Sequence, residues 1–147
     1  MDIKYWKNLS NWVNSKGLNL ELNPMPSKFQ NGMGNLNYKI ILNNKPFVLR
    51  RPPLGPIPPG ANDMKREYNV MHALNKKFSL VPNSILLCED ESIFGAPFHI
   101  MDFKEGITVN GDKLPNNFSS EENANYLSKM LIEVLVKLHN INPSDVG

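Results

Sequence analysis

The spacing of apolar residues predicts a helix at the start of the chain and strands after it. Over residues 3–15 one apolar stripe recurs with helical spacing, at Ile3, Trp6, Leu9, Trp12 and Val13. Leu18, Leu20 and Leu22 then alternate with polar residues, as in a half-buried strand. Residues 29–42 predict a strand, a glycine turn and a second strand, and residues 47–50 predict the strand that returns after a tight turn.

A second helix is predicted over residues 62–76, after a stretch that cannot be helical. Five prolines lie within residues 52–59 and exclude a helix or a central strand there, so a stiff, extended loop is expected. Asn62 or Asp63 can cap the helix that follows. Glu67 lies on the same face of that helix as its apolar residues, which are Met64, Met71 and Leu74.

The rest of the chain predicts a hairpin and one long helix. Residues 84–88 and 97–101 are short apolar runs joined by an acidic turn, which indicates a second antiparallel pair. Residues 106–117 are polar, with glycine and proline, as in a connector. Ser119 and Glu122 have the spacing of a capping box for a helix that runs to residue 140. Antiparallel hairpins with one inserted helix predict an α+β fold and not a parallel βαβ fold.

The composition is that of a globular protein of one domain. Of the 147 residues, 41% are hydrophobic and 20% are charged. A net charge of +2 is too small to predict a nucleic-acid or membrane partner. No apolar run approaches the roughly 20 residues that span a bilayer. Because residues 1–6 also lack the apolar core of a signal peptide, a cytoplasmic location is expected.

Arg50 and Glu67 are the candidate charged pair. Arg50 ends a short apolar strand, and Glu67 needs a partner because burying a carboxylate alone is costly. A protein kinase makes such a pair from a strand lysine and a helix glutamate, and it holds the phosphates of ATP with it. Arginine would bind phosphate oxygens in a fork. The alternatives are that Arg50 is a surface residue, as its neighbour Arg51 is expected to be, and that Arg51 or Arg66 is the partner of Glu67.

The segment Gly32-Met33-Gly34-Asn35 is a candidate phosphate-covering loop. Glycine lets backbone N–H groups approach an anion closely. An ordinary hairpin turn is the commoner explanation of such a segment. The segment alone does not separate the two.

Three further residues are candidates for reactive groups, and the sequence supports none of them. His72 and His139 lie on predicted helices near apolar faces, with no carboxylate placed to orient them. Cys88 lies in an apolar run before three acidic residues, which would raise the pKa of a thiol. A single cysteine excludes an internal disulfide, and no cluster of Cys and His has zinc-ligand spacing.

The proline-rich loop supports an alternative function. Two PxxP patterns, at residues 53–56 and 56–59, lie beside basic residues. Such a segment can dock into an SH3-type groove, so a non-catalytic protein-interaction module that uses loop 52–59 is an alternative. A stiff connector is the commoner role of such a loop.

Several segments together carry a resemblance to one known family. They are Gly32-Met33-Gly34-Asn35-Leu36-Asn37-Tyr38, Val48-Leu49-Arg50-Arg51-Pro52-Pro53-Leu54-Gly55-Pro56, Arg66-Glu67-Tyr68, Leu87-Cys88-Glu89-Asp90, Gly95-Ala96-Pro97-Phe98-His99-Ile100-Met101 and Leu138-His139. In these segments the chain resembles the aminoglycoside phosphotransferase-like kinases, above all the branch that is fused in animals to acyl-CoA dehydrogenase domains. The resemblance covers nearly the whole chain, and its most specific part is the run from Leu49 to Pro56.

The resemblance implies that the chain binds ATP with Mg. By position, the phosphates would be covered by Gly32, Met33, Gly34 and Asn35. Arg50 would hold the phosphates, and Glu67 would fix Arg50. The family often has serine at the position of Gly34 and threonine at that of Asn37, so here only backbone N–H groups would serve in the loop.

The base of the nucleotide would lie at the end of the last predicted strand. The resemblance implies that Met101 borders the adenine pocket. Backbone groups of Asp102 and Lys104 would hydrogen-bond the adenine edge.

The resemblance also implies a protein-kinase-like N-terminal lobe, with an antiparallel sheet of about five strands and one packed helix. Residues 1–105 would form this nucleotide-binding lobe, and residues 106–147 a linker and the first helix of a truncated second lobe. The catalytic-loop Asp and the metal-binding Asn and Asp of such kinases have no counterpart here. We therefore expect a lobe that serves transfer of the ATP γ-phosphate to a hydroxyl group of a small acceptor and that is inactive as this piece. A nucleotide sensor without catalysis is a further alternative.

Overall fold

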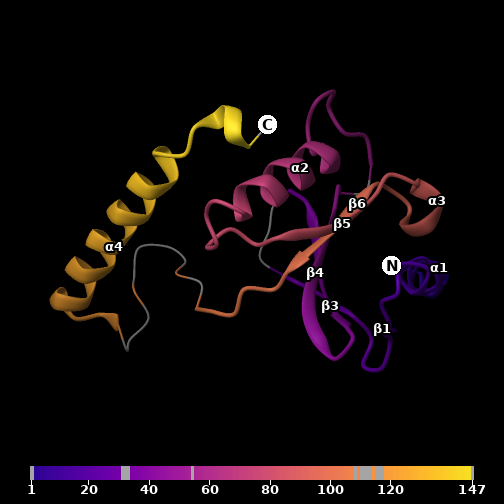
Figure 1. The fold of residues 1–147 in the computed structure, drawn as a ribbon. Coiled ribbons are helices and arrows are strands. Elements are labelled where there is room, and N and C mark those ends of the chain that lie inside the picture. Colours follow the sequence, from indigo (N-terminus) through magenta and orange to yellow (C-terminus); the bar gives the residue numbers. More distant parts are fainter. Residues whose placement is uncertain are drawn as a thin grey trace. The chain divides into compact units, whose positions relative to one another are not determined.

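The computed structural model describes residues 2–30, 34–53, 55–107, 109, 114 and 118–146. The chain divides into two compact units, Met1–Phe103 and Lys104–Gly147. The elements of the first unit are α1 (Ile3–Asn14), β1 (Leu20–Glu21), β2 (Ser27–Lys28), β3 (Leu36–Leu42), β4 (Lys45–Arg51), α2 (Met64–Asn75), β5 (Ser84–Cys88), α3 (Glu91–Phe94) and β6 (Phe98–Asp102) (Figure 1).

The first unit is built on one antiparallel sheet, as the sequence predicts. Its strand order is β1-β3-β4-β6-β5, and β2 pairs with β3 beside β1. Strands β3 and β4 form the predicted hairpin, with Leu42 opposite Lys45. The turn residues Asn43 and Asn44 have φ values of 48° and 62°, in the left-handed region that tight hairpin turns require and that Asn tolerates. Of the six strands in the described part of the chain, β1 and β2 have two residues each, so the predicted count of about five is close.

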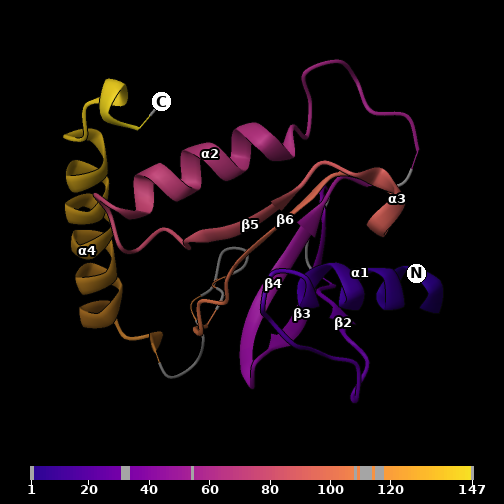
Figure 2. The same cartoon turned by 45° about the vertical axis from the view of Figure 1, so that its right-hand side comes forward.

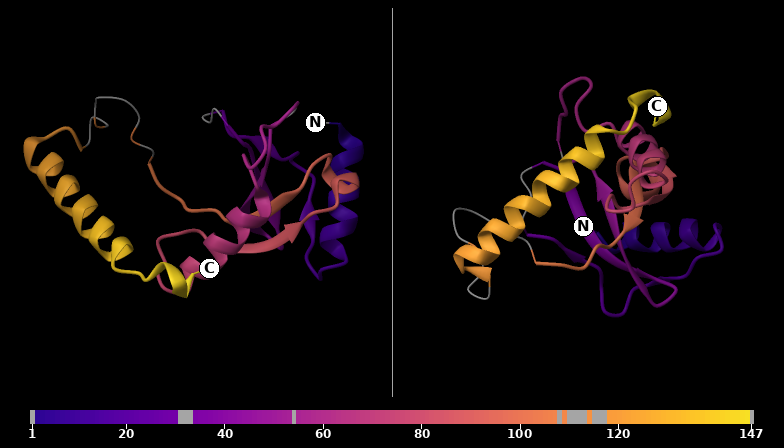
Figure 3. Two further views of the ribbon diagram at one scale, coloured as in Figure 1. Left: turned by 90° about the horizontal axis from the view of Figure 1, so that it is seen from above. Right: turned by 60° about the vertical axis from the view of Figure 1, so that its left-hand side comes forward.

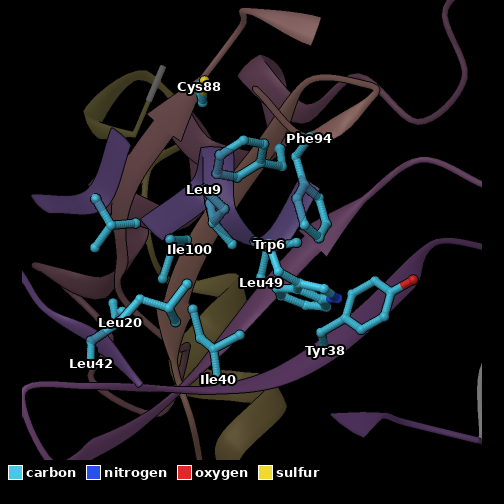
Figure 4. Close-up of a cluster of buried hydrophobic side chains, with 12 residues drawn as sticks. Trp6, Leu9, Leu20, Tyr38, Ile40, Leu42, Leu49, Cys88, Phe94 and Ile100 are labelled. Carbon is cyan, nitrogen blue, oxygen red and sulfur yellow. The ribbon is translucent and has the colours of Figure 1, made fainter. Parts of the chain in front are cut away.

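The hydrophobic core lies between helix α1 and one face of the sheet (Figure 4). Trp6, Leu9 and Val13 of α1 are at most 3% exposed. They pack against apolar side chains of the sheet, namely Leu20, Tyr38, Ile40, Leu42, Leu49, Phe98 and Ile100. The ring of Trp6 meets that of Tyr38 edge to face, with centroids 5.3 Å apart. The predicted helical stripe is therefore the inner face of α1.

Helix α2 covers the opposite face of the sheet, where it packs against β5 and β6 (Figure 2). Successive side chains of a strand point to opposite faces. Because Leu49 and Ile100 enter the core beneath α1, their neighbours Arg50 and His99 lie on the α2 face. The asymmetry of the sheet, with one apolar face and one partly polar face, positions the candidate site.

The connection between β5 and β6 differs from the sequence prediction. An acidic turn is predicted there, and the structure has the short helix α3, which lies beside α1 (Figure 3). The carboxylate of Asp90 accepts a hydrogen bond from the N–H of Ser92 at 2.9 Å and caps the helix, which lowers the pKa of Asp90. Gly95 ends α3 with φ 75°, a conformation that glycine adopts without strain. The pattern of acidic residues does not reveal a helix of only four residues.

The second unit contains the long helix that the sequence predicts, α4 (Glu121–His139), and a 3-10 turn, η2 (Pro143–Asp145). The helix begins one residue later than the predicted capping box, because Ser120 and not Ser119 is the N-cap. The Oγ of Ser120 accepts from the N–H of Asn123 at 3.2 Å. Among the described residues, no helix is both long and apolar enough to cross a membrane.

Candidate functional site

Arg50 and Glu67 form the predicted ion pair. The Nε of Arg50 donates to the Oε2 of Glu67 at 2.7 Å. Glu67 is in the first turn of α2, which begins after the N-cap Asp63, one of the two predicted caps. The two side chains keep 29% and 27% of their surface exposed, so a ligand in solvent can reach the pair. The contact is confirmed, whereas its role in binding phosphate stays a prediction.

Two asparagine side chains support the pair. The Nδ2 of Asn35 donates to the Oε1 of Glu67 at 3.1 Å, so both carboxylate oxygens are engaged. Asn37 lies opposite Arg50 in the β3–β4 register, and its Oδ1 accepts from the Nη1 of Arg50 at 3.2 Å. From the sequence, Asn37 is notable only for lacking the hydroxyl that threonine would have at this position. In the structure its amide instead holds the guanidinium in place.

His99 also belongs to this cluster, although the sequence alone does not mark it as a site residue. Its side chain is completely buried on β6, and its Nδ1 lies 2.9 Å from the Oγ of Ser84 on β5. Its Nε2 lies 3.7 Å from the Oε2 of Glu67 and has no hydrogen-bond partner among the described residues. Burial lowers the pKa of His99, and the nearby Arg50 lowers it further, while Glu67 opposes both. A polar residue between Phe98 and Ile100 in an apolar strand is the sequence signal that marks this position.

Arg51 lies on the other face of the sheet, which corrects the expectation that it is a surface residue. It is 2% exposed. Its guanidinium donates to the carbonyl oxygens of Pro52 at 3.1 Å, Phe94 at 2.6 Å and Gly95 at 3.5 Å. Burial lowers the pKa of Arg51, but an arginine stays charged at neutral pH. Arg51 therefore ties β4 to the end of α3 and is not a partner of Glu67.

Arg66, the other rival partner of Glu67, also points elsewhere. Its Nη2 donates to the carbonyl oxygen of Gly60 in the proline-rich loop at 3.0 Å. Arg66 and Glu67 line a shallow pocket together with Val70 and Met71 of the same helix. Glu67 thus borders both the arginine and an open surface.

The predicted phosphate loop is only partly described. Gly32 and Met33 lie outside the described residues. Gly34 is exposed, and among the described residues no atom lies within 4 Å of the position that a Cβ would take. Asn35 is 8% exposed and binds Glu67, so its side chain belongs to the ion-pair cluster.

The predicted adenine edge lies at the end of β6. Met101 pairs with Val48 of β4 in the sheet. The N–H of Asp102 donates to the carbonyl oxygen of Asn83 at 3.0 Å, and its Oδ2 accepts from the N–H of Asn83 at 3.2 Å. Of the backbone groups of Asp102, the carbonyl therefore remains the candidate for a base. Lys104 is the first residue of the second unit.

An aromatic stack lies next to this edge. The rings of Phe29 and Phe103 stack with centroids 6.2 Å apart and planes 15° apart. The Nζ of Lys39 lies 4.5 Å from the centroid of Phe103, which is a cation–π distance. Phe103 directly follows β6, so these contacts lie beside the end of that strand.

Two further candidates, His72 and Cys88, are held by contacts inside the fold. The Nδ1 of His72 lies 2.9 Å from the carbonyl oxygen of Ser84, and its ring stacks on that of Tyr68. Cys88 is buried, and burial is the main cause that raises the pKa of its thiol. Among the described residues, no group of three or more His, Cys, Asp and Glu side chains could hold a metal ion.

Residues 27–147 match the phosphotransferase enzyme family. The chain is 35% identical over 115 residues to acyl-CoA dehydrogenase family member 10 of Mus musculus, and 32% identical over 120 residues to acyl-CoA dehydrogenase family member 11 of Gallus gallus. These alignments cover 78% and 82% of this chain, but only 11% and 15% of the two relatives.

A solved structure from Ralstonia eutropha JMP134, assigned as an aminoglycoside phosphotransferase, matches 96% of this chain. The TM-score is 0.69 and the identity is 27%, and the match covers 40% of the bacterial protein. The family match over residues 27–147 agrees with the strand order of the sheet and with the α2 helix that carries Glu67. The chain belongs to the phosphotransferase enzyme family, and its first unit has the fold of the aminoglycoside phosphotransferases.

Proposed function

We propose that the first unit is the nucleotide-binding part of a phosphotransferase that moves the γ-phosphate of ATP to a hydroxyl group of a small acceptor. The observation that carries this proposal is the Arg50–Glu67 pair at 2.7 Å, in a chain of the phosphotransferase family. A cation fixed by a helix carboxylate is what such enzymes use to hold phosphates.

Arg50 is suited to this role by its free donors. Among the described residues its Nε is engaged by Glu67 and one Nη1 hydrogen by Asn37, which leaves a fork of N–H groups for phosphate oxygens. A guanidinium held at two points loses little rotamer freedom when a ligand arrives. The pair is also partly exposed, so binding does not require the sheet to open.

The other proposed contacts follow the end of β6. Met101 would border the base, and the carbonyl of Asp102 and the backbone of Lys104 would bind its edge. Gly32, Met33, Gly34 and Asn35 would cover the phosphates with backbone N–H groups. A carbonyl that accepts from the base and an N–H that donates to it would select adenine by complementarity.

The proposal assigns these 147 residues a binding role and no catalytic residue. The described residues offer no metal-ligand cluster, and the carboxylate of Glu67 is already bound by Arg50 and Asn35. The described residues therefore do not fit a magnesium site of their own. We expect the 147-residue chain to bind ATP weakly and to transfer no phosphate, because the Arg50–Glu67 pair is partly exposed and an exposed site buries less of its ligand.

Calorimetric titration of the chain with ATP and with adenosine tests the proposal. Arg50→Ala should weaken ATP binding and leave adenosine binding unchanged, since adenosine has no phosphates. Lys65→Ala is the matched control, because it also removes one positive charge. Lys65 instead pairs with Glu89 at 3.2 Å, and both side chains are more than half exposed.

Equal ATP affinity of Arg50→Ala and the wild type would overturn the phosphate role. No ATP binding at all would favour the protein-interaction alternative that uses loop 52–59. Binding without transfer by a longer protein that carries this chain would favour a nucleotide sensor. Turnover by the 147-residue chain alone would show that catalytic groups are present here.

A further inference from the structure

His99 is buried, polar and incompletely satisfied, and the proposed function does not use it. It lies on β6 with 0% exposure, flanked by two residues of the apolar core. A buried polar atom without a hydrogen-bond partner costs free energy, so such an atom in a folded protein calls for an explanation. The Nε2 of His99 is such an atom among the described residues, and it faces Glu67.

The surroundings determine which ring nitrogen carries the proton. The Oγ of Ser84 lies 2.9 Å from Nδ1 and can donate to it. The proton of a neutral ring is then on Nε2, where it points toward the carboxylate of Glu67 at 3.7 Å. The opposite tautomer would place a lone pair against that carboxylate, which is repulsive. Ser84 and Glu67 thus favour the same tautomer.

Glu67 can move toward His99, whereas His99 cannot move toward Glu67. The ring is fixed inside the sheet, but the glutamate side chain is 27% exposed and is held by side chains alone. The distance of 3.7 Å exceeds that of a hydrogen bond by less than an ångström. A small shift of the Glu67 carboxylate therefore brings the same Oε2 that binds Arg50 into hydrogen-bond contact with His99.

We propose that His99 is a positioning residue for the Arg50–Glu67 pair: its Nε2–H faces the carboxylate of Glu67 and holds it in place while Glu67 fixes Arg50 for an anionic ligand. This inference rests on the proposed phosphate role of Arg50. Without His99, the carboxylate of Glu67 would have one polar group fewer beside it, and it would hold Arg50 less firmly. Protonation of His99 strengthens its hold on Glu67 and adds a positive charge near the ligand, so acid should favour anion binding.

The charged and titratable groups around His99 are few. Glu67 and His72 face it from α2, the latter across the Ser84 backbone, and Arg50 faces it from β4. Ser84 of β5 is uncharged. Glu67 favours the charged form of His99 and Arg50 disfavours it. A titration of His99 therefore reports on this pair.

The first experiment follows the ring nitrogens and protons of His99 by NMR during a pH titration of the chain without ligand. We expect the Nε2–H tautomer at neutral pH, and we expect Glu67→Gln to lower the pKa of His99 further. Glu89→Gln is the control, because it removes an exposed carboxylate just after β5 that pairs with Lys65. It should leave the titration of His99 unchanged. An Nδ1–H tautomer, or a His99 titration that ignores Glu67→Gln, overturns the inference.

The second experiment compares ATP and adenosine affinity at pH 7.5 and pH 6 for the wild type, His99→Phe and Ser84→Ala. His99→Phe should lose about threefold or more of the ATP affinity, and the ratio of wild type to variant should grow at pH 6. Adenosine affinity should not change. Comparing variants at the same pH cancels the titration of ATP itself, and His72→Gln controls for the neighbouring ring.

The outcomes separate the two proposals. If the wild type binds no ATP, the proposed function fails, and the NMR result alone decides whether His99 supports Glu67. If the wild type binds ATP but His99→Phe and Ser84→Ala keep its affinity and pH profile, the inference fails and the proposed function stands. Should His99→Phe not fold, Ser84→Ala provides the same comparison with the imidazole still in place.

Discussion

The Nε of Arg50 lies 2.7 Å from the Oε2 of Glu67, and this contact joins strand β4 to helix α2 across 17 residues of sequence. It is the shortest side-chain contact of a cluster that also includes Asn35, Asn37 and His99. These residues lie in or directly before β3, in β4, in α2 and in β6, so the cluster exists only once the sheet and α2 have packed. Stability and ligand binding are therefore expected to be linked at this pair.

Glu67→Ala should lower the free energy of unfolding by about 1–2 kcal/mol. It leaves the guanidinium of Arg50 and the amide of Asn35 without their acceptor, although partial exposure lets water replace some of it. Chemical denaturation measures the loss. Glu89→Ala is the control, because its exposed pair with Lys65 should contribute about 0.5 kcal/mol or less. Equal effects of the two substitutions would show that the Arg50–Glu67 pair is no more than a surface ion pair.

Arg51→Ala should lower the free energy of unfolding by about 3 kcal/mol. This loss should exceed that of Arg50→Ala. It removes a side chain that is 2% exposed and leaves three carbonyl oxygens without their donor. Arg51→Lys should recover only part of the loss, since an ammonium cannot reproduce the fork. Thermal or denaturant unfolding measures both effects.

The two neighbouring arginines should then separate stability from binding. Arg50→Ala is expected to impair ATP binding with a small loss of stability. Arg51→Lys is expected to lose stability but to keep ATP binding under conditions in which it is folded. Strand alternation is the reason, because the two side chains lie on opposite faces of the sheet. Loss of ATP affinity in folded Arg51→Lys equal to that of Arg50→Ala would contradict this division.

Gly34→Ser should be tolerated and should strengthen ATP binding, by about threefold or more if the hydroxyl reaches a phosphate. The φ of Gly34 is outside the left-handed region, and among the described residues other than its chain neighbours nothing lies within 4 Å of the position of a Cβ. A serine would add the donor that backbone N–H groups alone do not supply. Calorimetry with ATP measures the gain, and Gly34→Ala shows what the extra methyl group does without the hydroxyl. Weaker binding by both variants would mean that the loop needs glycine there.

The sequence predicts the elements of the first unit well because their patterns are local. The stripe of Trp6, Leu9 and Val13 identifies the core face of α1, and the spacing of Glu67 from Met64 identifies the buried side of α2. The sequence also predicts the Arg50–Glu67 contact, because a carboxylate on an apolar helix face needs a cation.

What the sequence does not predict depends on strand register and on contacts between distant segments. Asn37 meets Arg50 because β3 and β4 pair in one particular register. The burial of Arg51 depends on α3, a helix of four residues that carries no periodic signal. His99 joins the cluster only because β5 places Ser84 beside its Nδ1 and α2 places Glu67 near its Nε2.

The stability of the chain should depend on pH through His99. Burial, aided by Arg50, lowers the pKa of His99 in the folded state below its ordinary value of about 6.5. Between that value and the lower folded pKa, the unfolded chain binds a proton that the folded chain does not. The contribution of neutral His99 is thus fully present above about pH 6.5 and is lost as the pH falls through the folded pKa. The wild type should therefore lose more stability between pH 7.5 and pH 5 than His99→Gln does, whatever their difference at pH 7.5. Denaturant unfolding of both proteins across this range measures the two slopes, and other titrating groups cancel in the comparison. Parallel slopes would mean that the His99 ring is as easily protonated in the folded chain as in the unfolded one, and that its burial beside Arg50 has no electrostatic consequence.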